Sequence, residues 1–323
     1  MGNQLCRLNK PFLIMALSLL LITACYQPDI QKPHILQKHP VECRVIKHEF
    51  GETCVPIKPQ RIIALDPENT LDPLIALGIK PIGFGSYTHK GEEFLLGISF
   101  DEVKGAKNVG NAYQPSLEKI LMLKPDLILS ANAHQYKLLS TIAPTVPVPY
   151  PNYTMLVHQA FFKENLRYVA KIIGEEAKAE EVLNQYQIRI EELKKRIGNH
   201  LEQAEISVLF HAGGNIWTII KGIKPISPIL TDMGVRHKFA LPGNGSWKLS
   251  IENIGEYDSD ILFIVDVDRR GASFYFQHPI FSSLKAFKNN RVYFVDKVGW
   301  YTLGISGANK TLDDLFKYLP LGK

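Results

Sequence analysis

Short apolar runs alternate along the chain with stretches in which apolar residues recur every three or four positions. Four apolar runs in the first half have the length and composition of buried strands: 61–65, 80–84, 126–129 and 146–149. Three stretches beside them have helical periodicity: 69–77, 116–123 and 135–142. Strands that alternate with helices are typical of an α/β fold, so we expect a sheet of parallel strands.

The second half of the chain starts the same pattern again. It has strand-like runs at 206–210, 260–265 and 291–295 and helix-like stretches at 228–233 and 250–257. Residues 116–120 (SLEKI) match residues 250–254 (SIENI) at an offset of 134 positions. The strand-like segments 126–129 and 260–263 match at the same offset. Two similar lobes are the simplest explanation of this repetition.

The longest helical stretch, residues 175–197, lies between the two halves. Its apolar positions fall on one helical face: Ala179, Val182, Leu183, Tyr186, Ile190, Leu193 and Ile197. At a rise of 1.5 Å per residue, the helix is roughly 35 Å long, about the diameter of a lobe. We therefore expect an N-terminal α/β lobe at 42–174, a bridging helix at 175–198 and a C-terminal α/β lobe at 199–323.

Residues 1–24 have the features of a signal peptide. Two cations precede an apolar run at 12–22, which is too short to remain in a bilayer as a spanning helix. The run leads into LITAC, which resembles the cleavage box of bacterial lipoproteins and makes Cys25 the expected acylated N-terminus. An ordinary cleavage site followed by an unrelated cysteine is the alternative. Residues 25–41 are polar and contain prolines, which indicates a lipid-anchored tether.

Two further cysteines, Cys43 and Cys54, flank a segment with the pattern of a β-hairpin. A turn at His48-Glu49 would place them opposite each other, whereas a turn at Phe50-Gly51, which the glycine favours, would put them out of register. A disulfide persists in an exported protein, so we expect the two cysteines to be bridged. Two buried free thiols are the alternative.

Composition and motifs exclude several function classes. Lys and Arg (37) exceed Asp and Glu (32) by only five and form no long basic run, so nucleic-acid binding is not expected. The sequence contains no G-x-S-x-G, H-E-x-x-H, G-x-G-x-x-G or P-loop pattern, which argues against an enzyme. Its ten His residues are scattered and lack acidic partners at ligand spacing, so a site for a bare metal ion is not expected.

Four longer stretches carry a resemblance to a known family: RIIALDPENTLDPLIALGIKPIGFG, PSLEKILMLKPDLILS, AKAEEVLNQYQIRIEEL and HPIFSSLKAFKNNRVYFVD. In this order they resemble the substrate-binding lipoproteins of ABC transporters that import ferric siderophores, ferric citrate and vitamin B12. The opening CRVIKHEFGETCVP is similar to the hairpin that begins many ferric-siderophore members. The resemblance implies a class III periplasmic binding protein: two Rossmann-like lobes joined by one long backbone helix, with a ligand cleft between the lobes.

The resemblance also implies a function. An extracytoplasmic lipoprotein, held by Cys25 at the outer face of the cytoplasmic membrane, would capture a ferric siderophore of the hydroxamate or citrate type. It would deliver this cargo to an ABC permease dimer and its ATPase, without a cofactor and without catalysis. A cobalamin- or haem-binding transport lipoprotein is one alternative. An exported enzyme or an interaction module on the same fold is another.

The candidates for ligand binding follow from chemistry and position. A ferric chelate is bulky, partly apolar and rich in oxygen atoms, so its site needs aromatic walls and Arg or Tyr donors. In open α/β sheets such groups belong in loops at the carboxyl ends of strands. Ten residues meet these criteria: Tyr87, Tyr113, His134, Trp217, Trp247, Arg269, Arg270, Tyr275, Trp300 and Tyr301. A core position for Trp217 and a solvated loop tip for the arginines are the competing explanations.

Two acidic residues occupy the same place in the repeated units. Glu118 and Glu252 each lie two residues after a serine at an expected helix N-cap, one in each lobe. A carboxylate in the first turn interacts favourably with the helix dipole, and this local role is the simpler explanation. The family resemblance implies a second role, in which one surface Glu per lobe contacts Arg residues of the permease.

Overall fold

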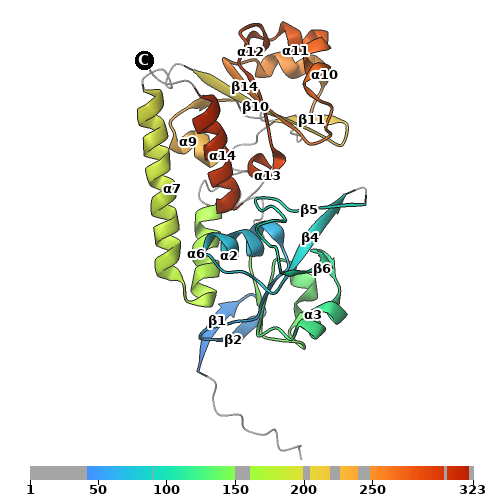
Figure 1. Ribbon diagram of the computed structural model, residues 1–323, viewed down its shortest axis with the longest axis vertical. Helices are drawn as coiled ribbons and strands as arrows, with labels where there is room; N and C mark the ends of the chain where they lie inside the picture. The colour runs from blue at the N-terminus through green and yellow to red at the C-terminus, as the bar shows by residue number, and fades with distance from the viewer. Residues whose placement is uncertain are drawn as a thin grey trace, which may run out of the picture. The chain divides into compact units, whose positions relative to one another are not determined.

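The computed structural model describes residues 42–89, 91–149, 161–198, 204–218, 226–238, 248–301 and 304–319 (Figure 1). The expected signal peptide, the tether, Cys25 and Trp247 lie outside these residues. Within the described ranges, no helix is both long enough and apolar enough to cross a membrane.

The first sheet is built on parallel strands and defines the N-terminal lobe. Its strands are β3 (Ile62–Ala64), β4 (Gly83–His89), β5 (Glu92–Phe94), β6 (Lys107–Asn111), β7 (Gln114–Pro115), β8 (Leu127–Ser130) and β9 (Thr145–Pro147). Their order is β7-β6-β4-β3-β8-β9, with β5 paired to β4. The pairs among β6, β4, β3, β8 and β9 are parallel, whereas β5 and β7 pair antiparallel. The predicted parallel sheet is therefore present.

The second sheet defines the C-terminal lobe. Its strands are β10 (Glu205–Ala212), β11 (Asn215–Thr218), β12 (Arg236–His237), β13 (Lys248–Leu249), β14 (Ile261–Asp266) and β15 (Val292–Val295). Their order is β13-β11-β10-β14-β15, and β12 pairs with β10. The pairs of β10 with β14 and of β14 with β15 are parallel, while β11 pairs antiparallel with β10.

The repeat in the sequence corresponds to a repeat in strand order. β8 lies between β3 and β9 in the first sheet, and β14 lies between β10 and β15 in the second. The two sequence segments that match at the offset of 134 positions lead into β8 and β14 and form the first part of each. Because both are central strands that are apolar up to their last residue, the same short sequence pattern suits both places.

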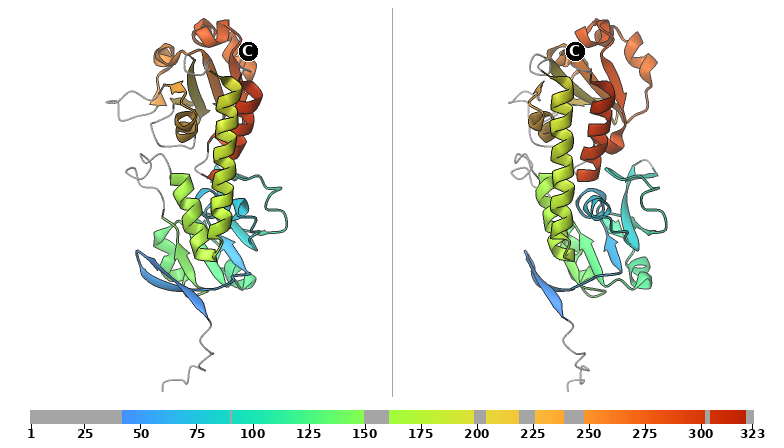
Figure 2. Two further views of the ribbon diagram at one scale, coloured as in Figure 1. Left: turned by 90° about the vertical axis from the view of Figure 1, so that its left-hand side faces the viewer. Right: turned by 60° about the vertical axis from the view of Figure 1, so that its left-hand side comes forward.

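Helices pack on both sheets (Figures 1 and 2). In the N-terminal lobe they are a π-helical turn η2 (Pro67–Leu71), α2 (Asp72–Ala76), α3 (Leu117–Leu123), a 3₁₀ turn η3 (Ala133–Gln135), α4 (Tyr136–Leu139) and α6 (Phe161–Ile173). In the C-terminal lobe they are α9 (Ile226–Asp232), a 3₁₀ helix η4 (Ile251–Tyr257), α10 (Ala272–Gln277), α11 (Pro279–Ser283), α12 (Lys285–Lys288) and α13 (Lys297–Trp300).

The bridging helix α7 (Glu176–Ile197) begins one residue after the predicted start and ends at the predicted residue. All the apolar positions predicted for its inner face are buried: Ala179, Val182, Leu183, Tyr186, Ile190, Leu193 and Ile197. They belong to one apolar cluster that also includes residues of both sheets, such as Phe84 and Phe263. The helix is therefore part of a core that both lobes share.

The last helix, α14 (Ile305–Tyr318), runs beside α7 (Figure 2). Its buried side chains include Ile305, Ala308 and Leu312, which join the shared core. Arg189 of α7 donates hydrogen bonds to the side chain and the carbonyl of Asn309 (2.7 and 3.2 Å). Two helices, rather than the one that the sequence predicted, thus extend along the connection between the lobes.

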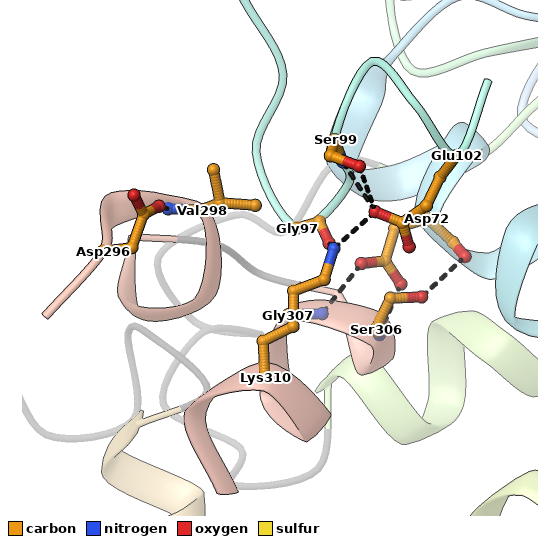
Figure 3. Close-up of polar contacts among 9 residues, drawn as sticks. All are labelled: Asp72, Gly97, Ser99, Glu102, Asp296, Val298, Ser306, Gly307 and Lys310. Atoms are coloured by element: carbon orange, nitrogen blue, oxygen red, sulfur yellow. Dashed lines mark hydrogen bonds and ion pairs between the residues drawn. The ribbon is translucent and has the colours of Figure 1, made fainter. Parts of the chain in front are cut away.

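Asp72 of α2 joins the N-terminal lobe to the start of α14 (Figure 3). Its two carboxylate oxygens accept hydrogen bonds from the backbone N–H groups of Ser306 (2.9 Å) and Gly307 (3.2 Å). These groups have no partner within their own helix, so Asp72 caps a helix through Ser306, a residue 234 positions later in the chain. Burial raises the pKa of Asp72 to about 6, although these hydrogen bonds oppose the increase.

Lys310, one turn further along α14, forms the other half of this junction (Figure 3). Its ammonium donates to the carbonyl of Gly97 (2.8 Å) and to Oε2 of Glu102 (2.6 Å). The backbone N–H of Gly97 donates to the carbonyl of Val298 in α13 (2.9 Å). The loop that follows β5 is therefore tied to two helices of the C-terminal half.

A second polar junction connects α6, α7 and α9. The ammonium of Lys163 and the phenol of Tyr186 both donate to Oδ2 of Asp232, at 2.9 and 3.0 Å. Burial and the neighbouring Asp232 raise the pKa of Tyr186, so this phenol remains protonated. Polar contacts of Asp232 therefore connect the lobes at a place separate from the junction at Asp72.

The chain before the first sheet forms the expected hairpin, from β1 (Cys43–His48) and β2 (Gly51–Pro56). Its turn is at Glu49-Phe50, between the two alternatives that the sequence left open. Cys43 and Cys54 form a disulfide with their Cα atoms 5.4 Å apart. Each cysteine lies two positions from the residue opposite the other, so the bridge crosses the ladder diagonally. The predicted disulfide is therefore present. It forms although the two cysteines do not lie directly opposite each other, which we had expected it to require.

The hairpin is attached to the N-terminal lobe by side-chain contacts. Arg44 donates to the carbonyl of Ile172 at the end of α6 (3.1 Å). The hydroxyl of Thr53 donates to the carbonyl of Thr145 in β9 (2.9 Å). An isolated two-stranded hairpin is only marginally stable, so these contacts and the disulfide hold it in place.

Two predicted elements differ from the structure. The strand predicted to end at Phe84 continues to His89, because its second half pairs with β5 beyond the parallel sheet. The helix predicted at 250–257 is a 3₁₀ helix that contains Gly255, a residue that weakens an α-helix. The other predicted strands of the two sheets agree within a few residues.

Candidate ligand-binding site

Tyr87 occupies the extended second half of β4, not the loop where we expected it. Its ring stacks on that of Tyr113, with centroids 5.8 Å apart, and lies 5.6 Å from the ring of Phe94. Its phenol donates to Oδ2 of Asp66 at 3.0 Å and approaches Glu68 at 3.4 Å. Tyr87 is buried, so it forms the base of an aromatic surface.

Two buried acids lie directly after β3. Oδ1 of Asp66 accepts from the backbone N–H groups of Glu68 (3.0 Å) and Asn69 (2.7 Å), which caps η2. Burial raises the pKa of Asp66 against these hydrogen bonds. Burial, followed by the charges of Asp66 and Glu68, raises the pKa of Tyr113, and burial and Glu68 do the same for Tyr301. The two phenols therefore remain protonated.

Tyr113 lies in the turn after β6, and His134 lies in the 3₁₀ turn η3 after β8. Tyr113 is 56% exposed. Its carbonyl accepts from the side chains of Asn132 (3.4 Å) and Gln135, which ties the two loops together. His134 is exposed, and its backbone N–H donates to Oδ1 of Asn132 (3.0 Å).

In the C-terminal lobe, His211 near the end of β10 faces α10. Its Nδ1 is 2.9 Å from the phenol oxygen of Tyr275. Burial lowers the pKa of His211, and burial followed by Asp266 raises the pKa of Tyr275. Both groups are therefore neutral near pH 7. Tyr275 is fully buried beneath His211, so it supports the imidazole and does not form an open surface.

A cavity of about 230 Å³ opens beside His211. Its lining comes from the C-terminal lobe alone: His211, Gly214, Asn215, Ile216, Leu249, Ile251, Arg270 and Phe274. The guanidinium of Arg270 lies 5.8 Å from the centroid of the Phe274 ring. Of the nine expected ligand residues that the structure describes, Arg270 is the one that lines this cavity.

Arg269 has a different environment from its neighbour. It adopts a left-handed backbone conformation (φ 56°) in the loop after β14. Its guanidinium lies 3.9 Å from the carboxylate of Glu92 in β5, and both side chains are 75% exposed. An exposed pair of this kind contributes little to stability. Arg269 therefore contacts the N-terminal lobe rather than the cavity.

The aromatic residues of the C-terminal lobe divide between the core and the candidate site. Trp300 is 1% exposed, and its Nε1 donates to Oδ2 of Asp314 (2.8 Å). The expectation that Trp300 forms part of the ligand surface is contradicted, because its ring packs on Phe263 in the core. Trp217 is partly buried against the same core. Tyr301, by contrast, is partly buried and packs against the cluster of Tyr87, Leu96 and Ala112 as well as against the ring of Phe210.

Glu118 and Glu252 are both exposed, in the first turns of α3 and η4. The hydroxyl of Ser116 accepts from the N–H of Lys119 (3.2 Å), as expected for an N-cap. Ser250 occupies the corresponding position but makes no such bond. The two acids thus share a position in the fold, although their helices differ in type.

The part of the chain that the structure describes contains no cluster of three or more His, Cys, Asp or Glu residues that could hold a metal ion. The sequence matches the family described as periplasmic binding protein over residues 62–298. The chain belongs to this family. This membership, together with the two sheets and the bridging helix, confirms the predicted two-lobed α/β fold.

Curated relatives and solved structures agree with this assignment. This periplasmic binding protein is 30% identical to the "Probable siderophore-binding lipoprotein YfiY" of Bacillus subtilis (strain 168), over 85% of this chain and 87% of the relative. It is 31% identical to the "Achromobactin-binding periplasmic protein" of Dickeya dadantii (strain 3937), over 80% and 85%. Staphylococcus aureus SirA, solved with staphyloferrin B, has a TM-score of 0.67 and 27% identity, over 86% of this chain and 99% of SirA.

Several residues of the site escaped the sequence-based selection. His211, Phe274 and the acids Asp66 and Glu68 were not among the candidates. A usable signal existed for His211 and Asp66, since each is a polar residue at the end of a long apolar run, where a parallel strand presents its carboxyl end. Phe274 has no such signal, because its position depends on how α10 packs against β10.

Proposed function

We propose that this periplasmic binding protein captures a ferric siderophore outside the cytoplasmic membrane and delivers it to an ABC permease, without catalysing a reaction. The observation that carries the proposal is the meeting of the carboxyl edges of the two sheets. Tyr301 of the C-terminal lobe packs against a cluster of the N-terminal lobe formed by Tyr87, Leu96 and Ala112, and the ammonium of Lys297 lies 5.3 Å from the ring of Phe94. Aromatic surfaces and cations from both lobes therefore lie at one place.

The chemistry of this place suits a bulky, oxygen-rich cargo. Tyr113 and Tyr301 supply protonated phenols, and Arg270 supplies a guanidinium that can donate to chelate oxygens. The names of YfiY and of the D. dadantii protein and the ligand of SirA support a siderophore as cargo. Since siderophore oxygens already fill the coordination sphere of iron, the protein needs no metal-binding cluster of its own.

Ligand titration tests the proposal. Binding of ferric citrate, a ferric trihydroxamate, haem and cobalamin is measured by quenching of tryptophan fluorescence. We expect saturable binding of at least one ferric chelate with a Kd below roughly 10 μM. If neither ferric chelate binds, the proposal is refuted. If only cobalamin or haem binds, the protein is instead a transport protein for that ligand.

We propose further that Glu118 and Glu252 contact the permease. Both are exposed, and Leu121 and Met122, one turn from Glu118, are 60% and 74% exposed. Exposed apolar side chains around a carboxylate favour a protein partner over plain solvent at this surface. The paired substitution Glu118→Arg/Glu252→Arg should abolish iron uptake by cells while chelate affinity stays within about twofold. Glu192→Arg, on the exposed face of α7, is the matched control. Normal uptake in the double variant would restrict both acids to a local role.

Attachment to the membrane through acylated Cys25 completes the proposed function. The name of YfiY includes the word lipoprotein, which supports this part of the proposal. Labelling with an alkynyl fatty acid should mark the wild-type protein but not the Cys25→Ser variant. This variant should also be absent from the membrane fraction. An unlabelled wild-type protein would show that the signal peptide is removed at an ordinary cleavage site.

A further inference from the structure

The cavity beside His211 is lined by apolar walls and a small number of polar groups. Ile216, Leu249, Ile251 and Phe274 form apolar walls from four different segments of the C-terminal lobe. Its volume of about 230 Å³ exceeds that of a cavity of about 150 Å³ that holds one benzene molecule. The space is thus sufficient for one six-membered ring and is small for a complete chelate.

The polar groups that line the cavity include the imidazole of His211 and the amide of Asn215. Nδ1 of His211 lies 2.9 Å from the phenol oxygen of Tyr275, and burial and the nearby Asp266 keep this phenol neutral. Arg270 adds an exposed guanidinium. The charged groups nearest to His211 are Asp266, Asp268 and Arg270. Asp268 is already engaged, since it accepts from the N–H groups of the β10–β11 turn (2.7 and 2.8 Å).

We infer that this cavity binds an aryl group of the siderophore, a ring attached directly to a group whose oxygens ligate iron. The inference rests on the proposed function and specifies its substrate. The ring packs between Phe274 and the aliphatic walls, and its iron-bound oxygens lie near the guanidinium of Arg270. An acyclic carboxylate or aliphatic arm fits less well, because a carboxylate loses hydration against apolar walls and a thin chain leaves the cavity partly empty.

A matched pair of probes isolates the ring. Ferric tris(benzohydroxamate) and ferric tris(acetohydroxamate) have the same iron ligation and differ in a phenyl or a methyl substituent. We expect the phenyl complex to bind roughly tenfold to a hundredfold more tightly, as the buried area of one ring predicts. Both complexes are titrated with excess hydroxamate so that they stay intact, and binding is followed by tryptophan fluorescence.

Substitutions on α10 locate the effect. Phe274→Leu removes the ring that faces the cavity and should reduce the phenyl preference about tenfold, whereas Phe274→Tyr keeps the ring and should retain the preference. Phe276→Leu is the control on the same helix, since Phe276 is outside the cavity and 48% exposed. Ile251→Trp, which fills the cavity, should abolish the preference. Circular dichroism verifies folding of each variant.

The outcomes separate the inference from the proposed function. Equal affinity for the two complexes, or a phenyl preference that survives both Phe274→Leu and Ile251→Trp, overturns the inference and leaves the proposed function intact. Failure of these complexes together with ferric citrate and the ferric trihydroxamate overturns both. A phenyl preference that is lost in Phe274→Leu and kept in Phe276→Leu establishes the aryl site.

Discussion

Asp72 provides a direct test of how the two lobes are joined. Its carboxylate is completely buried and caps α14 through Ser306 and Gly307. Burial raises its pKa from 3.8 to about 6. Because the folded state holds this proton more tightly than the unfolded state, the linked stability is fully present below pH 3.8 and is lost as the pH rises through 6.

The magnitude follows from the two pKa values. The difference of about 2 pH units, at about 1.4 kcal/mol per unit, amounts to about 3 kcal/mol over the whole titration. Between pH 8 and pH 5 the expected gain in the free energy of unfolding is about 1.4 kcal/mol. Asp72→Asn cannot ionise, so its stability should lack this component. The buried Asp66 has a raised pKa in both proteins and cancels in the comparison.

Urea unfolding of both proteins at pH 5, 6, 7 and 8, followed by circular dichroism, measures the effect. The wild-type stability should increase toward pH 5 by about 1.4 kcal/mol more than that of Asp72→Asn. Asp101→Asn, at an exposed position, is the matched control and should follow the wild type. Parallel pH profiles for wild type and Asp72→Asn would refute the reasoning. Asp72→Ala should be destabilised at every pH by about 2–4 kcal/mol, because two N–H groups lose their acceptor.

Three further predictions concern binding and stability. Arg270→Ala should weaken chelate binding roughly tenfold or more, whereas Arg269→Ala should change it less than about threefold; equal effects in isothermal titration would contradict the assignment of Arg270 to the cavity. Cys43→Ser should lower the free energy of unfolding by about 3 kcal/mol in the chain-entropy model, and an unchanged denaturation midpoint would show that contacts alone hold the hairpin. Trp300→Phe should lower stability by about 1–3 kcal/mol through the lost bond to Asp314 while affinity is retained; a selective loss of affinity would return Trp300 to the ligand surface.

Local patterns predicted much of the fold but less of the site. The inner face of α7 was predictable because helical periodicity depends on residues only a few positions apart. The cap formed by Asp72 was not, since its partners are distant in sequence and nothing near Asp72 indicates them. The same limit explains why the prediction for Trp300 was wrong. A tryptophan that follows a strand has the same sequence context whether its ring faces a ligand or packs on Phe263. Arg270 and Arg269 are adjacent, yet one left-handed φ angle gives them different surroundings.

The cap on α14 also affects the order in which contacts can form during synthesis. The ribosome makes Asp72 long before it makes Ser306 and Gly307, so α2 can form its contacts with α14 only after nearly the whole chain has been synthesised. Contacts between segments so distant in sequence slow the search for the native state. The first lobe is therefore not an autonomous folding unit, and a chain truncated before α14 should leave Leu74 and its neighbours exposed to chaperones and proteases.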